Sequence, residues 1–240
     1  MSQPDAVPPP KELPEVPPDR ASRDPWWTWG YRILAPVFHL LFRIRYVGRS
    51  NIPPDGGVIL ASNHISVLDP VIIAMAVTTT GRAVRFLAAA EFFRKPVIGW
   101  GLRRIRQIPI RRGASDRRAL EQAARVIRRG ALAGIFPEGT LSPDGELLPG
   151  KRGAARLTLA SGMPILPCGI WGTRARWPRG GIRWQRPLRP RVVVSFGPVI
   201  EPAGELEDPT DVQATTDRIM AAIAEQVAAA RASVERPRRA

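Results

Sequence analysis

Short apolar runs alternate with amphipathic stretches from residue 44 to about residue 200. Runs of four to seven apolar residues are typical of strands buried on both faces, and apolar residues spaced three or four apart indicate helices. Strands that alternate with helices predict an α/β fold: a single domain with a largely parallel central sheet flanked by helices. The expected strands are 58–62, 85–89, 107–110, 131–136, 164–170 and 191–196, and the expected helices are 70–77, 95–104, 115–129 and 153–161.

The amino-terminal part differs in character from this domain, which we bound at 44–205. Residues 1–25 contain eight prolines and few large apolar groups, so we predict a disordered tail. Residues 26–43 begin with three clustered tryptophans and continue into a short apolar run with arginines beside it. Indole rings favour lipid headgroups and arginines pair with lipid phosphates, so we predict an amphipathic helix in a membrane interface. Packing of this helix on the domain's own core is the alternative.

The carboxyl-terminal part, 206–240, is predicted to form a helix followed by a basic tail. Its apolar positions Val212, Ile219, Ile223 and Val227 share one helical face. The last ten residues are strongly basic.

Composition narrows the choice of compartment. The chain has 240 residues, 44% of them hydrophobic, which is normal for a globular protein with a full core. Its one cysteine, Cys168, excludes an internal disulfide framework, fits a reducing compartment and lies in an apolar run typical of the core. We expect no signal peptide, because the amino terminus is polar and Pro-rich with no early apolar region. We expect no membrane-spanning helix, because no apolar run reaches about 18 residues. The predicted location is peripheral, on the cytoplasmic face of a membrane.

The net charge of +15 is concentrated in two segments. Residues 94–118 carry nine basic side chains against one acidic one, and residues 174–191 carry seven arginines and no acid. Such segments attract nucleic acid, anionic lipid headgroups or phosphorylated substrates. A nucleic-acid-binding module is disfavoured because aromatic residues do not interleave with the 94–118 arginines and no binding motif is present. The expected partner is a membrane surface with anionic phospholipids, not nucleic acid.

One of the two histidines, His64, stands five positions before Asp69 in the stretch SNHISVLDP. A structural interpretation is available, because Asp before Pro70 is typical of a helix N-cap followed by proline at the first helical position. In that case His64 is a turn residue. A catalytic interpretation needs His64 in the turn after the strand, because five residues within one helix lie about 140° apart. The Asp69 carboxylate could then fold back and hold the imidazole in one tautomer.

Polar residues follow two further predicted strands. In a parallel sheet the carboxyl ends of strands meet at one edge, where ligands bind. There is no G-x-S-x-G motif and Cys168 lies in a core strand, so His64 is expected to activate a nucleophile supplied by the substrate. Beside His64, the residues expected at this ligand-binding edge are Arg111 and Arg112 after the strand 107–110, and Glu138, Gly139 and Thr140 after the strand 131–136.

These motifs resemble the lysophospholipid (1-acyl-sn-glycerol-3-phosphate) acyltransferase family. The family's H-x4-D motif appears as His64 and Asp69, and its second block as IPIRRG, in which Arg112 matches the usual arginine. Its third block, F-P-E-G-T-R, appears as FPEGT at 136–140, and its fourth, an apolar strand with proline, as PILP with Pro167. All four blocks occur in the family's order and span about residues 44–200.

The resemblance implies transfer of a fatty acyl group from an acyl thioester, either acyl-CoA or acyl carrier protein, to the hydroxyl of a lysophospholipid. The expected acceptor is 1-acylglycerol-3-phosphate and the expected product is phosphatidic acid. His64 would take the hydroxyl proton and Asp69 would stabilise the imidazolium. No metal or other cofactor is expected. Acyl transfer to a different lipid or glycolipid, and a lipid-ester hydrolase that uses water, remain as alternatives.

The acceptor's phosphate is expected to contact Arg111, Arg112, Gly139 and Thr140, with Glu138 ordering the loop. Two positions depart from the family pattern. Leu141 stands where the family has an arginine associated with this phosphate, and Arg111 replaces an acidic residue. Phosphate binding is therefore expected to rely on Arg111 and Arg112, or else the acceptor is not 1-acylglycerol-3-phosphate.

Overall fold

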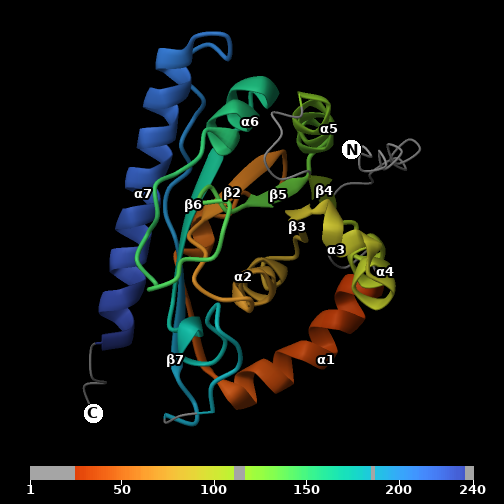
Figure 1. Ribbon diagram of the computed structural model, residues 1–240, viewed down its shortest axis with the longest axis vertical. Helices are drawn as coiled ribbons and strands as arrows, with labels where there is room; N and C mark the ends of the chain where they lie inside the picture. The colour runs from red at the N-terminus through yellow and green to blue at the C-terminus, as the bar shows by residue number, and fades with distance from the viewer. Residues whose placement is uncertain (1–24, 111–116, 185–186, 236–240) are drawn as a thin grey trace, which may run out of the picture.

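The central sheet has seven strands in the part of the chain that the computed structural model describes, which is residues 25–110, 117–184 and 187–235 (Figure 1). The strand order is β1-β7-β6-β2-β5-β3-β4. The strands are β1 (Arg43–Val47), β2 (Val58–Ser62), β3 (Val84–Ala89), β4 (Ile108–Ile110), β5 (Leu132–Ile135), β6 (Ile165–Trp171) and β7 (Arg191–Phe196). The helices are α1 (Pro25–Leu41), α2 (Asp69–Thr78), α3 (Ala90–Arg94), α4 (Pro96–Arg104), α5 (Arg117–Arg128), α6 (Gly153–Ser161) and α7 (Pro209–Glu235).

The predicted α/β domain with a largely parallel sheet is confirmed. Neighbouring strands are parallel throughout except for β6 and β7, which pair antiparallel. The four strands β6, β2, β5 and β3 form the parallel centre. Their carboxyl ends therefore open onto one edge, which is where the polar motifs were expected to meet.

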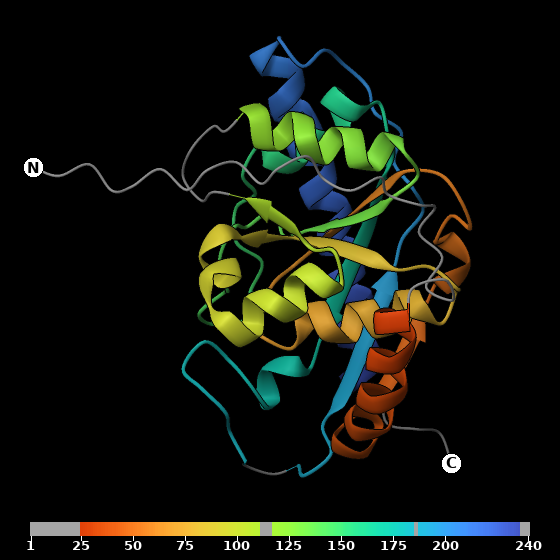
Figure 2. The same cartoon turned by 90° about the vertical axis from the view of Figure 1, so that its right-hand side faces the viewer.

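The sheet is buried on both faces because its central strands are largely apolar. All five residues of β2 are buried. Val58 and Leu60 join one apolar cluster, with α1 and α2, whereas Ile59 and Ala61 join the other, with α5, α6 and α7. This alternation follows from the period of two in a strand. Figure 2 shows the two helical layers: α1, α2 and α4 lie on the opposite side of the sheet from α5 and α6.

The helix α1 packs on the domain's own core along one face, as the alternative interpretation of the amino-terminal segment expected. Trp27 and Ala35 are buried against the domain, and Phe38 and Leu41 pack on the same cluster. Trp29, Ile33 and Leu40 nevertheless remain 61%, 64% and 70% exposed, so an apolar stripe faces outward. Within the described ranges, no helix combines the length and apolar content that crossing a bilayer requires.

Three elements differ from the sequence prediction, and one of them is the strand β1 (Arg43–Val47), which was not predicted. The helix α1 ends at Leu41 and not at residue 43, because Arg43 already belongs to β1 and donates its backbone N–H to the carbonyl of Pro190. The short helix α3, inserted between β3 and α4, was not predicted. The predicted tail at 1–25 lies outside the described residues except for Pro25, as does the basic tail after Glu235.

Candidate active site

The turn between β2 and α2 is fixed by Asn63, which is buried. Its side-chain amide donates to the carbonyl of Ile170 at 3.0 Å and accepts from the N–H of the same residue at 2.8 Å. These two bonds continue the β2–β6 pairing by one residue beyond Ser62. The chain therefore leaves the sheet at a defined point, and His64 is the first residue after it.

His64 and Asp69 are in direct contact. Nδ1 of His64 lies 3.0 Å from Oδ2 of Asp69, whose side chain is fully buried, whereas 14% of the His64 side chain remains exposed. His64 lies in the turn and Asp69 is the first residue of α2, as the catalytic interpretation required. With Nδ1 engaged by the carboxylate, the other ring nitrogen, Nε2, is left to meet a substrate.

The Asp69 carboxylate points back into the turn and not forward along α2. Oδ2 also accepts the backbone N–H groups of Ile65 and Ser66, both at 2.7 Å, and Oδ1 accepts the hydroxyl of Thr173 at 2.6 Å. No side chain caps the amino end of α2. The N-cap interpretation of Asp69 is therefore wrong, although Pro70 does occupy the first turn of the helix as expected.

The imidazole of His64 is held in plane by an aromatic stack. Its ring lies 4.0 Å from the ring of Phe136 with an interplanar angle of 15°, and Phe136 stacks in turn on Phe86. The backbone of His64 is fixed on both sides, because its N–H donates to Oε1 of Glu138 at 2.7 Å and its carbonyl accepts from Ser142 at 2.8 Å. The segment after β5, residues 136–142, thus holds the histidine by its backbone and by its ring face.

Glu138 is turned inward, away from solvent. Besides the His64 N–H, its carboxylate accepts the N–H of Leu148 through Oε2 at 3.1 Å, so it ties the loop after β5 to the turn that contains His64. Burial raises the pKa of Glu138, and the two backbone hydrogen bonds partly offset that effect. Gly139 follows in the left-handed region with φ of 67°, a conformation that favours glycine, and Thr140 is partly exposed beside it.

The remaining predicted residues lie elsewhere or are not described. Arg111 and Arg112 follow β4 directly, outside the described residues. Pro167 is buried within β6, where its carbonyl accepts from Gly197. Cys168 is fully buried, and burial raises the pKa of its thiol to about 12, which favours the protonated form.

Three residues at the site were missed in the sequence. Thr173 follows β6 and contacts Asp69, and the position of a hydroxyl just after a strand end was the available signal. Ser66 joins the turn that contains His64 to the segment after β6, because its hydroxyl donates to the carbonyl of Trp177 at 2.7 Å. Lys151 lies against Gly139, which no local pattern indicated.

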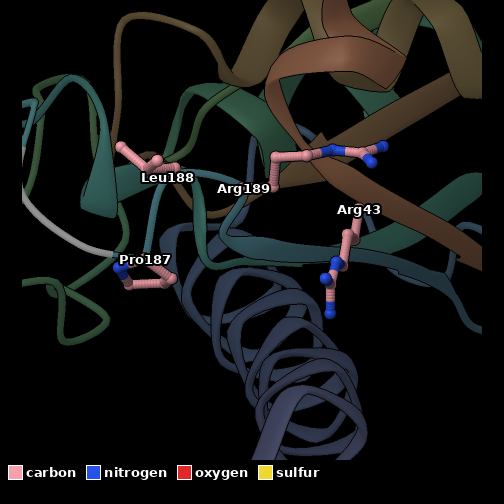
Figure 3. Close-up of a pocket in the computed structure, with 4 residues that line it drawn as sticks. All are labelled: Arg43, Pro187, Leu188 and Arg189. Carbon is pink, nitrogen blue, oxygen red and sulfur yellow. The ribbon is translucent and has the colours of Figure 1, made fainter.

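A pocket of about 710 Å³ is lined by Arg43, Pro187, Leu188 and Arg189 (Figure 3). None of the residues that contact His64 or Asp69 lines it. Across the described ranges, no group of three or more His, Cys, Asp or Glu side chains gathers as a metal-binding set.

Known proteins share both the sequence and the shape of this chain. A family model described as Acyltransferase matches residues 43–171. A chloroplastic 1-acyl-sn-glycerol-3-phosphate acyltransferase of Brassica napus is 32% identical over 136 residues, which are 55% of this chain and 38% of the relative. An enzyme of the same name from Pseudomonas aeruginosa is 29% identical over 181 residues, 74% of this chain and 65% of the relative.

Among solved structures, the crystal structure of the 1-acyl-sn-glycerophosphate acyltransferase of Thermotoga maritima matches with a TM-score of 0.63 and 26% identity. The match covers 82% of this chain and 78% of that one. The chain spans less than half the length of the plant and algal relatives that it matches, whose matched shares are 38%, 39% and 48%.

Proposed function

Since this chain belongs to the acyltransferase family, we propose that it transfers a fatty acyl group from an acyl thioester to the free hydroxyl of 1-acylglycerol-3-phosphate, giving phosphatidic acid. The observation that supports this proposal best is the His64–Asp69 pair, in which a buried carboxylate holds one ring nitrogen and the other remains available. The names of the relatives support the choice of acceptor.

The proposed reaction is direct attack. Nε2 of His64 takes the proton of the acceptor hydroxyl as its oxygen bonds to the thioester carbon, and the carbonyl oxygen becomes an oxyanion. When the tetrahedral intermediate collapses, the carbon–sulfur bond breaks and the imidazolium returns its proton to the leaving thiolate. The Asp69 carboxylate stabilises the imidazolium between these two transfers and keeps the proton of the neutral ring on Nδ1.

No side chain of the protein is required as nucleophile in this scheme. Cys168 is buried and protonated, and its strand lies beside β2 within the sheet. The donor is proposed as acyl-CoA or an acyl carrier protein. The expected kinetic signature is a ternary complex without an acyl-enzyme intermediate.

We propose that the enzyme works at a membrane surface through α1 and α4. Trp29, Ile33 and Leu40 form the outward stripe of α1, and Val97 and Trp100 are exposed on α4. The two helices meet where Trp26 packs edge-to-face on Trp100 at a centroid distance of 5.3 Å. Arg104 lies over both of these rings, which supports one aromatic and cationic surface suited to lipid headgroups.

The pocket lined by Arg43, Pro187, Leu188 and Arg189 lies near the carboxyl-terminal end of α1, and it supports the same placement of α1 at the membrane surface. In Figure 3, Arg43 and Arg189 lie on one side of the pocket and Leu188 on the other. Arg189 also donates to the carbonyl of His39 at 2.6 Å, which joins this arginine to the last turns of α1. Arginines beside an exposed apolar helix are suited to anionic phospholipids, whose phosphates they can reach while the apolar stripe enters the interface.

The test of the activity is acyl transfer itself. The full chain is incubated with a labelled acyl thioester, with and without 1-acylglycerol-3-phosphate, and both thiol release and labelled phosphatidic acid are measured. Thiol release that depends on the acceptor and matches product formation supports the proposal. Thiol release without acceptor, with free fatty acid as product, indicates a hydrolase and overturns it.

The test of membrane association is cosedimentation with vesicles of anionic phospholipid. Trp29→Ser combined with Ile33→Ser should weaken binding by about tenfold or more, because it removes apolar surface from the interface. Val199→Ser, which removes an exposed apolar side chain on the segment after β7, is the control and should bind as the unchanged protein does. Equal vesicle binding by the unchanged protein and both variants would contradict the proposal that α1 binds the membrane.

A further inference from the structure

The side chain of Lys151 lies directly over Gly139. A Cβ placed on Gly139 would come within 2.9 Å of Nζ and within 3.1 and 3.2 Å of Cδ and Cε of Lys151. The turn favours glycine because of its φ of 67°. The ammonium group lies beside the backbone of the PEGT turn.

The backbone places Lys151 there as firmly as the side chain does. Its N–H donates to the carbonyl of Pro137 at 2.9 Å, and Leu148, three residues earlier, donates to Glu138. The loop from 137 to 151 is thus closed at its base by two hydrogen bonds. Because the same Glu138 carboxylate accepts the His64 N–H, Lys151 borders the turn that carries the catalytic histidine.

The ammonium of Lys151 is available for a ligand. Among the described residues no carboxylate forms an ion pair with it, and its side chain is exposed. The other cation that packs on this loop, Arg174, instead donates to the carbonyl of Pro143 and faces Asp144. The next residue, Arg152, is directed to α7, where it donates to Gln213 at 3.1 Å.

From this juxtaposition we infer that Lys151 binds the phosphate monoester of the acceptor at the Gly139 turn. The inference rests on the proposed function and specifies which cation selects a phosphorylated headgroup. The turn carries no basic side chain of its own, since Leu141 follows Thr140. A phosphate with close to two negative charges needs charge-assisted partners, and an ammonium beside exposed backbone provides one.

The experiment measures steady-state kinetics of the full chain with 1-acylglycerol-3-phosphate and an acyl-CoA, each varied in turn. Lys151→Met should raise the acceptor KM by about tenfold or more, which corresponds to about 1.4 kcal/mol. It should leave the donor KM within about twofold, and Lys151→Arg should recover most of the acceptor affinity. Arg152→Met removes the same charge one residue later and should leave both KM values unchanged.

The outcomes separate this inference from the proposed function. If the unchanged protein does not acylate 1-acylglycerol-3-phosphate, the proposed acceptor is wrong. If it does, and Lys151→Met keeps its acceptor KM while remaining folded by circular dichroism, the inference about Lys151 is wrong. A rise in the donor KM alone would assign Lys151 to the phosphates of CoA. Equal rises in Lys151→Met and Arg152→Met would indicate general attraction by the basic surface, and either result overturns the inference.

Discussion

Replacing Asp69 by asparagine removes a charge and changes little else. An asparagine oxygen at the position of Oδ2 can still accept from the N–H groups of Ile65 and Ser66 and from His64. The amide nitrogen would then face the Thr173 hydroxyl, which can rotate to accept. Asp69→Asn should therefore keep the turn and the α2 start, so that activity reports the charge.

The size of the expected fall in kcat follows from the distance between Nδ1 of His64 and Oδ2 of Asp69. Opposite charges 3.0 Å apart attract by about 5 to 6 kcal/mol at an effective dielectric constant of about 20. If about half of the imidazolium charge has developed in the transition state, the loss is about 3 kcal/mol, or about a hundredfold in kcat. Full charge development would raise the loss to about 10⁴-fold. We expect kcat to fall within this range.

The assay compares acyl transfer and thermal unfolding of the unchanged protein, Asp69→Asn and Asp217→Asn. Asp217 lies on α7, where it accepts from Gln213, so its variant makes the same chemical change away from the site. Asp217→Asn should retain full activity. Asp69→Asn should unfold within a few degrees of the unchanged protein and lose activity at saturating concentrations of both substrates.

Retention of most of kcat by a folded Asp69→Asn protein would refute the reasoning, because the carboxylate would then be only a structural acceptor. Residues that act as a unit show losses that do not add, so the double variant should be about as active as His64→Ala alone.

Three further variants test the surroundings of the pair. Thr173→Val should lower kcat about tenfold by leaving one buried carboxylate oxygen without its hydroxyl donor, whereas Thr173→Ser should restore it, as steady-state kinetics will show. Cys168→Ala should retain activity and no labelled acyl group should remain on the protein, because the thiol, with a pKa of about 12, is not ionised. Burial raises the pKa of Glu138 above its ordinary 4.5. The protonated Glu138 side chain therefore contributes fully to the free energy of unfolding below pH 4.5, and this contribution declines as the pH rises through the raised pKa. Glu138→Gln should remove this slope in denaturant titrations across that window.

The parallel core could be predicted because burial on both faces leaves a strong pattern. β2, β5 and β6 are continuous apolar runs bounded by polar turns, which no exposed element produces. β1 was missed for the opposite reason. Its sequence, RIRYV, places two exposed arginines at the sheet edge and follows α1 after a single residue, so its short period-two pattern merges with the helix.

Within the site, the residues predicted from spacing were those at strand ends. His64 after β2 and Glu138 after β5 come together because parallel strands end at one edge. Whether Asp69 caps its helix or turns back to His64 was open in the sequence, because both uses need the same residue type at that position. The direction of one side chain decides it, and that direction depends on Thr173, which is 104 residues away.

Leu141 stands where the family has an arginine, and this shows that the residues of a motif do not alone determine the charge at a binding site. A side chain reaches the Gly139 turn either because it follows the turn in sequence or because the loop returns to it. Here the loop returns, since Pro137 accepts from Lys151 and Glu138 accepts from Leu148. Lys151 can thus bring a cation to the Gly139 turn although Leu141, which follows the turn, carries no charge. This needs no change in the strand, in the turn or in the His64–Asp69 pair. Loss of the motif's arginine is consequently no argument against a phosphorylated acceptor in this chain.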